Sequence, residues 1–167
     1  NSVFPRMGEL GYLGLDKPVE YGGQGGDYFS AIVLAEEMTY ANCGGLAMGI
    51  AVHTDMAMPP ILAFGSEEQK QDWAVPAIKG EKILCLGITE PDAGSDVAGI
   101  KTRAVKDGDE YVINGSKTYI TNGHRADAIV LVTKTDPDAG YDGFTLFLIP
   151  MDTPGVKILG AMAVFGE

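Results

Sequence analysis

Two short segments in the second half of the chain gather hydroxyl, carboxylate and small residues where an apolar stretch ends. The first, ITEPDAGSD (88–96), follows the strand-like run KILCLG. Thr89 can present a hydroxyl at the end of a strand, Pro91 stiffens the exit, and Gly94-Ser95 let the backbone approach a ligand closely. Such a bend offers several amide groups to a polar, flat or anionic ligand.

The second segment, SKTYITNG (116–123), repeats this pattern further along the chain. It carries the aromatic ring of Tyr119, the hydroxyl of Thr121 and a turn at Asn122-Gly123. Two hydroxyl-bearing strand ends in one small sheet could hold the two edges of a ring. Either segment alone is a weak indication, and the pair predicts a binding site for a planar, polar ligand.

Three carboxylates of the first segment, Glu90, Asp92 and Asp96, could instead do acid–base chemistry. We favour a structural role for all three. Asp92 and Asp96 are expected to bond amides of the turn and of a helix start, and Glu90 to pair with a cation.

Two other patterns suggest sites that we reject. The glycine-rich EYGGQGGD (20–27) lacks the preceding strand and the Gly-Lys-Ser/Thr of a phosphate-binding loop, so it predicts a tight loop into the next helix. His53 and His124 have no Cys/His cluster at ligand spacing around them. We therefore expect capping or packing histidines and no metal site.

The composition predicts a folded chain of one compact domain or two small ones. Of its 167 residues, 46% are hydrophobic and 21% are charged, which allows a packed core. The net charge of −11 argues against nucleic acid or an anionic membrane surface as a partner. Cys43 and Cys85 lie in apolar stretches and predict two buried free thiols, with one disulfide as the alternative.

The sequence shows no membrane or signal segment. Its longest apolar run, LAMGIAV (46–52), is far shorter than the roughly 20 residues of a membrane-spanning helix. The N-terminus lacks the basic and apolar regions of a signal peptide. It also lacks an initiator Met, which suggests a fragment or a processed form.

Residues 1–80 predict mainly helices. Asp27 is a candidate N-cap for a helix over 27–42, whose apolar residues near one face are Phe29, Ile32, Val33 and Tyr40. A short buried helix is expected before Gly65. Ser66 and Gln69 have capping-box spacing, and Pro76 should end that helix or begin the next.

From Lys82 onward, short segments rich in β-branched and aromatic residues predict strands. They are KILCLGI (82–88), GIKTRAVK (99–106), DEYVIN (109–114), KTYIT (117–121), DAIVLVTK (127–134), GFTLFLIP (143–150) and VKILG (156–160). Asp107-Gly108 and Asn114-Gly115 are hairpin-type turns. The order predicts an α+β fold, with an all-helical part followed by a small antiparallel sheet or barrel, and a candidate boundary near Gly80.

Taken with their surroundings, the two polar segments closely resemble the acyl-CoA dehydrogenase family. ITEPDAGSDVAGIKT resembles the family's flavin-loop signature, and VINGSKTYITNG resembles its second flavin segment. LGYLGLDKPVEYGGQGGDY and GSEEQKQDWAVPAIKGEK resemble its N-terminal helical domain in order and spacing. The resemblance covers about residues 4 to 156, and it implies a helical domain over 1–81 and a middle β-domain over 82–167.

The resemblance implies FAD as cofactor and assigns roles to individual residues. Thr89 would bond the pyrimidine side of the isoalloxazine, and Thr121 would lie near its N5 atom. Tyr119, where many relatives carry Trp, would cover one side of the ring. Ser95 would also face the pantetheine arm of an acyl-CoA substrate. The implied FAD contacts are Leu86, Ile88, Thr89, Gly94, Ser95, Tyr119, Ile120 and Thr121.

The implied chemistry is α,β-dehydrogenation of an acyl-CoA thioester to the trans-2-enoyl-CoA, as in fatty acid β-oxidation. A glutamate base removes the α-proton while the β-hydrogen leaves as hydride to flavin N5. In the family that glutamate belongs to a C-terminal helical domain, so we expect it beyond residue 167. The family also implies an electron-transferring flavoprotein as partner, a homotetramer at full length, and a cytoplasmic or mitochondrial-matrix location.

Two alternatives remain open from the sequence. The chain could serve another flavin reaction on the same fold, that of an acyl-CoA oxidase or a flavin monooxygenase. It could also be a non-catalytic, truncated binding module, because the family's base is not among its residues and KILGAMAVFGE matches the family pattern only weakly.

Overall fold

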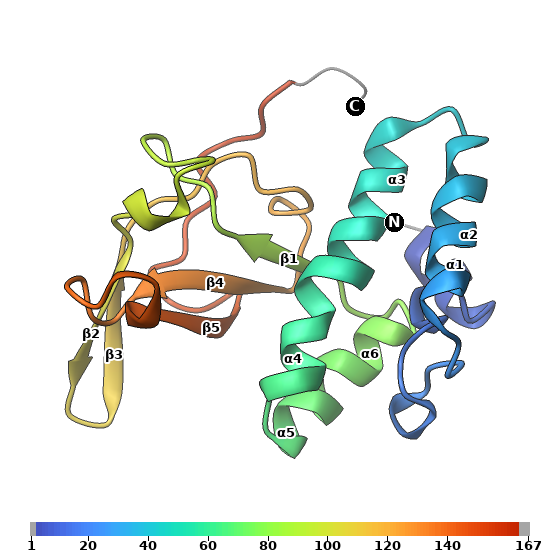
Figure 1. Cartoon of the computed structure of the whole chain (residues 1–167), viewed down its shortest axis with the longest axis horizontal. Coiled ribbons are helices and arrows are strands. Elements are labelled where there is room, and N and C mark those ends of the chain that lie inside the picture. The colour runs from blue at the N-terminus through green and yellow to red at the C-terminus, as the bar shows by residue number, and fades with distance from the viewer. Residues whose placement is uncertain (1–2, 164–167) are drawn as a thin grey trace.

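A computed structural model describes residues 3–163 of the chain. Helices occupy the first half and strands the second half, as Figure 1 shows with the helices on the right and the sheet on the left. The predicted α+β order is confirmed. The last helix ends at Ile78 and the first strand begins at Leu84, so the change of structure falls close to the predicted position.

The helices run in chain order with two wider π-helical segments between them. The α-helices are α1 (Val3–Glu9), α2 (Tyr28–Thr39), α3 (Gly44–Ala51), α4 (Met58–Phe64), α5 (Glu67–Gln69) and α6 (Val75–Ile78). The π segments Val52–Ala57 and Lys70–Ala74 join α3 to α4 and α5 to α6. Short 3-10 turns cover Tyr12–Gly14, Val19–Tyr21, Val97–Gly99 and Gly140–Gly143.

Helix α2 begins as predicted but turns a different face to the core. Asp27 caps it, since the carboxylate accepts a hydrogen bond from the Ser30 amide at 3.1 Å. Leu34 and Met38 pack against the core. The residues expected on one face are exposed instead: Phe29, Ile32, Val33 and Tyr40. The helix carries apolar side chains on all of its faces, so the periodicity of the sequence could not show which face is buried.

Helices α3 and α4 form one continuous helix of 21 residues, Gly44–Phe64. The expected short helix before Gly65 is its final part, and Gly65 ends it as predicted. By length and hydropathy alone, this helix could cross a membrane, which the separate apolar runs of the sequence did not indicate. A core helix of a folded domain passes the same test, and this one supplies Ala57, Met58 and Ile61 to the core.

Residues Glu67–Ile78 follow the predicted pattern closely. Ser66 and Gln69 make both hydrogen bonds of a capping box. Pro76 is the second residue of α6, which follows directly on the π segment Lys70–Ala74, so it lies near a helix start, one of its two predicted places. A proline cannot donate to the carbonyl four residues earlier, and that carbonyl, of Asp72, accepts a hydrogen bond from the Lys82 ammonium at 2.8 Å instead.

The sheet is mixed, which corrects the antiparallel prediction. Its strands are β1 (Leu84–Gly87), β2 (Arg103–Asp107), β3 (Glu110–Asn114), β4 (Ala128–Lys134) and β5 (Phe144–Pro150). Strand β4 pairs parallel with β1 and with the start of β2, and antiparallel with β5. The parallel pairing arises because the long segment between β1 and β4 returns the chain to the same end of the sheet.

Two predicted strands and one predicted hairpin are wrong. Residues 117–121 and 156–160 form no strand, whereas Asp107-Gly108 does start the β2–β3 hairpin. Tyr119 and Asn122 have positive φ angles of 56° and 67°, which interrupt an extended backbone. With no strand there, Asn114-Gly115 leads out of the sheet and does not form a hairpin.

The largest buried cluster lies where the helices meet the sheet. It contains Ala57, Met58, Ile61, Ala74, Ala77, Ile78, Leu84, Ala128 and Val130. His53 lies in the same region and is completely buried. Its Nδ1 accepts a hydrogen bond from the Leu84 amide at 3.1 Å, so Nε2 carries the proton and donates to the Ala77 carbonyl at 3.0 Å. Its expected role as a packing residue is confirmed.

Burial, which outweighs the bond to Ala77, lowers the pKa of His53 from 6.5 to about 4. The ring is therefore neutral near pH 7. His124 lies on the exposed side of a turn.

Both cysteines are free thiols, but only one is buried. Burial raises the pKa of the Cys85 thiol to about 12. Cys43 is exposed at the start of α3, which corrects the prediction of two buried thiols. The helix that follows Cys43 is buried only from Gly49 onward, so an apolar sequence did not indicate burial at its start.

Candidate functional site

The two polar segments predicted from the sequence lie side by side in the structure. The Thr118 amide donates to the Thr89 carbonyl at 2.9 Å. The Lys117 ammonium donates to the Ile88 carbonyl at 2.8 Å. These bonds connect the two residues that follow β1 to residues about thirty positions later in the sequence. A shared surface for one ligand is therefore structurally available.

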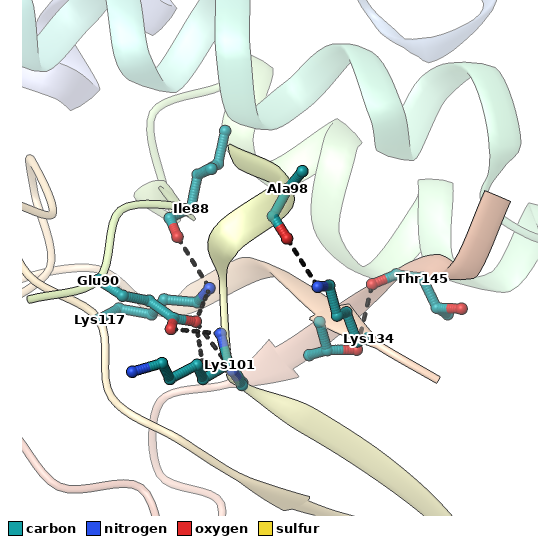
Figure 2. A network of polar contacts seen from close by, with 9 residues as sticks. Ile88, Glu90, Ala98, Lys101, Lys117, Lys134 and Thr145 are labelled. Atoms are coloured by element: carbon teal, nitrogen blue, oxygen red, sulfur yellow. Dashed lines mark hydrogen bonds and ion pairs between the residues drawn. The ribbon is translucent and has the colours of Figure 1, made fainter. Parts of the chain in front are cut away.

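A buried ion pair lies beneath this junction (Figure 2). Lys117 Nζ is 2.8 Å from Glu90 Oε1, and both side chains are nearly inaccessible to solvent. Glu90 also accepts hydrogen bonds from the amide groups of Lys101, at 2.6 Å, and Thr102, at 3.0 Å. The Thr102 hydroxyl bonds the same carboxylate. The expected pairing of Glu90 with a cation is confirmed.

The surroundings of Glu90 keep its carboxylate ionised. Burial on its own would raise the pKa, but the Lys117 ammonium, the Thr102 hydroxyl and the two backbone amides outweigh it. Together they lower the pKa of Glu90 from 4.5 to about 2. Burial lowers the pKa of Lys117, against the influence of Glu90. A carboxylate with four donors and such a low pKa is a structural anchor and a poor general base.

The other two carboxylates differ from the prediction. Asp92 pairs with the Lys101 ammonium at 3.0 Å on the surface, where both side chains are mainly exposed. Asp96 precedes the 3-10 turn Val97–Gly99, but its side chain makes no capping hydrogen bond there. The expected side-chain bonds to turn amides are therefore wrong for both residues. The turn closes through backbone bonds, such as the one from the Gly99 amide to the Asp96 carbonyl.

The bend between Glu90 and Ile100 is anchored at both ends and exposed in the middle. Ala93 and Ile100 are buried in a small cluster with Val132. Gly94 and Ser95 are exposed, and a side chain at Gly94 would meet open space. The Lys134 ammonium donates to the Ala98 carbonyl at 2.7 Å, as Figure 2 shows. The buried residues and the Lys134 bond hold the bend in place, while Gly94 and Ser95 remain exposed to solvent.

Strand β1 is an edge strand, and its free edge faces the second segment. The Leu84 amide bonds His53, and its carbonyl lies 3.5 Å from the Asn122 side-chain amide. Since alternate residues of a strand direct their amide and carbonyl to the same edge, Leu86 faces this edge too. Leu86 thus offers its backbone amide and carbonyl at this edge, and the half-buried Thr89 lies two residues after the end of β1.

The second segment contributes a ring and a hydroxyl from an irregular loop. Tyr119 is 68% exposed and has φ of 56°, so its ring is available for stacking. Ile120 and Thr121 are half-buried, and Thr121 begins a turn over residues 121–125. The position of Thr121 is therefore fixed by this turn and not by a strand.

Two residues that the sequence did not single out organise the site. Lys117 lies within the quoted motif, but no residue pattern showed that its ammonium would be buried against Glu90. Asn122 was assigned only to a turn, yet its side chain is 4% exposed and fully hydrogen-bonded. The Asn-Gly dipeptide was the one signal in the sequence that could have pointed to Asn122, because asparagine is favoured where a turn needs a positive φ.

The rejected patterns behave as loops and packing residues. Residues 22–26 form a loop that is hydrogen-bonded to the backbone of residues 14–18 and leads into α2, with Gly22 and Gly25 at positive φ. A Cβ at Gly23 would collide with the Lys17 carbonyl, which explains the glycine there. Within residues 3–163 there is no group of three or more His, Cys, Asp or Glu that could hold a metal ion.

An apolar pocket of about 280 Å³ lies in the helical half. Its lining includes Leu34 and Met38 from α2 and Ala47, Met48 and Ala51 from α3. None of the eight predicted FAD contacts borders it. The pocket and the polar site are therefore separate features of this chain.

Family models of two consecutive domains match the chain almost from end to end. The acyl-CoA dehydrogenase N-terminal domain matches residues 1–81, and the acyl-CoA dehydrogenase middle domain matches residues 85–167. The chain belongs to the acyl-CoA dehydrogenase family. The resemblance stated from the two polar segments is confirmed.

Individual acyl-CoA dehydrogenases agree with this assignment. A short-chain specific acyl-CoA dehydrogenase of Clostridium acetobutylicum is 44% identical over 153 residues, which are 92% of this chain and 40% of that protein. The crystal structure of an acyl-CoA dehydrogenase from Geobacillus kaustophilus superposes with a TM-score of 0.86 at 45% identity, over 92% of this chain and 40% of that one.

The fold also occurs in an oxidase. The crystal structure of the prolyl acyl carrier protein oxidase AnaB has a TM-score of 0.82 and 37% identity, over 92% of this chain and 41% of that one. This chain spans about two fifths of the length of the acyl-CoA dehydrogenases it matches.

Proposed function

We propose that this chain forms the flavin- and thioester-binding part of an FAD-dependent acyl-CoA dehydrogenase that oxidises an acyl-CoA to the trans-2-enoyl-CoA. The observation that carries the proposal is the junction of the two polar segments by Lys117 and Thr118. It supports one continuous binding surface from residues that lie far apart in the sequence. The division into a helical domain over 1–81 and a β-domain over 82–167 is part of the same proposal.

The groups at this surface suit the rim and the face of a flavin. Leu86 at the edge of β1, Ile88 just after the strand and the Thr89 hydroxyl would together hold the polar pyrimidine edge. Tyr119 and Ile120 would cover a face of the ring. The Thr121 hydroxyl would donate a hydrogen bond to flavin N5. FAD, when bound, supplies the acceptor for the hydride that leaves the β-carbon.

The exposed bend gives the substrate its place in this proposal. Gly94 and Ser95 are exposed and supported at both ends of the bend. Ser95 would contact both FAD and the pantetheine arm of the acyl-CoA. Glu90 is held as a structural anion and is a poor candidate for the base. The α-proton would be removed by the glutamate that the family resemblance leads us to expect beyond residue 167.

The remaining parts of the proposal concern the whole protein. An electron-transferring flavoprotein would take the electrons, and the full-length enzyme would be a homotetramer. Its place would be the bacterial cytoplasm or the mitochondrial matrix. The alternative with specific support is an oxidase, since the fold is shared with an acyl carrier protein oxidase. A truncated module that binds without turnover is the second alternative.

Flavin content and the fate of the electrons test this proposal. We expect the intact protein encoded by the gene to be purified yellow, with one FAD per chain that is released on denaturation. Its acyl-CoA-reduced form should pass electrons to an electron-transferring flavoprotein and react slowly with oxygen. Rapid formation of hydrogen peroxide would favour the oxidase, and absence of bound flavin would contradict both enzymes.

A further inference from the structure

Asn122 is a buried side chain whose hydrogen-bonding capacity is fully used. Its Nδ2 donates to the Gly49 carbonyl in α3 at 2.8 Å and lies 3.5 Å from the Leu84 carbonyl in β1. Its Oδ1 accepts from Arg125 Nε at 3.1 Å and from Nη2 at 2.7 Å. One side chain thus connects a helix, an edge strand and the loop that follows Thr121.

Arg125 and Gly49 complete this connection. The Arg125 guanidinium lies 5.4 Å from the centre of the Phe4 ring, which places a second element, α1, against it. A Cβ at Gly49 would lie 2.7 Å from Arg125 Nη2 and 3.1 Å from Asn122 Oδ1. Gly49 therefore leaves room for the pair at its present distance from α3, and a larger residue there would require the Arg125 guanidinium to shift.

The loop has its own reason to depend on Asn122. Its φ of 67° lies in the left-handed region, which asparagine tolerates better than most residues. The amides of Arg125 and Ala126 both donate to its carbonyl at 2.9 Å. The backbone and the side chain of Asn122 therefore fix the turn and its distance from α3 at the same time.

We propose that Asn122 and Arg125 are positioning residues, which hold the Tyr119–Thr121 loop at a fixed place against helix α3 and the edge of β1. The proposal rests on the proposed function, in which this loop contacts the flavin. In this role neither side chain needs to touch a reacting atom, because both act through the loop that they hold. Because Thr121 adjoins Asn122, a shift of this joint moves the hydroxyl that faces N5, and small displacements of that kind are costly in catalysis.

Hydrogen exchange in the intact protein tests the joint itself. Asn122→Gly keeps the left-handed backbone accessible and removes the side chain. We expect amide exchange to become about tenfold faster or more in peptides covering both 118–126 and 44–53, with strands β4 and β5 unchanged. Asn42→Gly is the matched control, because Asn42 is an exposed residue with φ of 50°. Faster exchange confined to residues 118–126 would show that Asn122 does not connect the loop to α3. Faster exchange to the same extent throughout the protein would also contradict this connection.

Anaerobic flavin reduction tests the positioning role. Asn122→Gly should keep its FAD, lower the rate constant for flavin reduction by acyl-CoA about tenfold or more, and shift the flavin midpoint potential. Arg125→Lys keeps the positive charge but loses the two hydrogen bonds to Asn122 Oδ1, and should show the same effects more weakly. It replaces Asn122→Gly as the test if that variant does not fold. A wild-type reduction rate in variants with faster exchange would overturn the positioning role. Wild-type protein that binds no FAD would contradict the proposed function instead. Hydrogen exchange would still show whether Asn122 and Arg125 hold the loop against α3.

Discussion

The structure separates the acidic residues of the flavin-loop signature by their burial. Glu90 accepts bonds from the Lys117 ammonium, the Thr102 hydroxyl and two backbone amides within a buried junction, whereas Asp92 makes an exposed pair with Lys101. Removing one partner of a buried pair leaves an uncompensated charge. Exposed pairs contribute little. The two residues should therefore respond very differently to the same chemical change.

Glu90→Gln should lower the free energy of unfolding by about 3–5 kcal/mol at pH 7, because the Lys117 ammonium remains buried without its counter-charge. Asp92→Asn, the matched control, should change it by less than about 1 kcal/mol. Urea unfolding measures both. Similar small changes in the two variants would show that Glu90 is not the anchor.

The pH dependence of stability gives a second test of Glu90. Its folded-state pKa of about 2 lies below the ordinary 4.5, so the folded state binds this proton less readily than the unfolded state. The stabilisation is complete above pH 4.5 and is lost as pH falls toward 2. The stability difference between wild type and Glu90→Gln should therefore shrink over that interval. A constant difference would contradict the low pKa.

Thr121 could contact the flavin through its hydroxyl or serve only as a structural residue of the turn, and substitution distinguishes these two roles. Thr121→Val removes the hydroxyl, and a tenfold slower flavin reduction corresponds to about 1.4 kcal/mol of transition-state stabilisation. We expect a loss of about this size in stopped-flow reduction of the intact protein. Thr121→Ser keeps a hydroxyl and should retain most of the rate. An unchanged rate in Thr121→Val, with unchanged FAD content, would make Thr121 a turn residue only.

At the scale of elements, local signals predicted the helix ends and the β2–β3 hairpin. Asp27, the Ser66–Gln69 box and Asp107-Gly108 act through contacts within a few residues, so the sequence displays them directly. The parallel pairing of β1 with β4 depends on residues more than forty positions apart. β-Branched composition cannot report such pairing, nor can it show that residues 117–121 leave the sheet.

The same limit applied to the candidate site. Its residue types and the two segments could be predicted from the sequence, since hydroxyl, aromatic and small residues were grouped there. The buried ammonium of Lys117 and the fully bonded amide of Asn122 could not, because each gains its role from carbonyl groups of distant elements.

The bend that carries Ser95 depends on Lys134. Lys134→Met keeps the length of the side chain but removes the donor to the Ala98 carbonyl. We expect faster hydrogen exchange at the Gly99 and Ile100 amides, which close the 3-10 turn, and a raised KM for acyl-CoA. Lys106→Met, on the exposed part of neighbouring β2, is the control. Unchanged exchange at both amides would show that the turn holds without Lys134.

At the scale of the whole molecule, the 167-residue chain exposes large apolar side chains over its helical half. Tyr28, Phe29 and Tyr40 are more than 70% exposed on or beside α2, and Phe64 is 85% exposed at the end of α4. Exposed apolar surface of more than a few hundred Å² tends to associate. The chain produced by itself should therefore self-associate or aggregate. A monodisperse monomer in sedimentation velocity, with one cooperative melting transition, would contradict this expectation.

In the function proposed above, this chain binds the flavin and the thioester, and the base is expected beyond residue 167. Anaerobic mixing with butanoyl-, octanoyl- or palmitoyl-CoA, followed by the loss of the visible flavin band, tests it most directly. The intact protein should be reduced by at least one of these thioesters, while residues 1–167 alone, supplied with FAD, should give no reduction above background. Reduction by residues 1–167 alone would place the base within the chain, and an intact FAD-loaded protein that none of the thioesters reduces would contradict the proposed reaction.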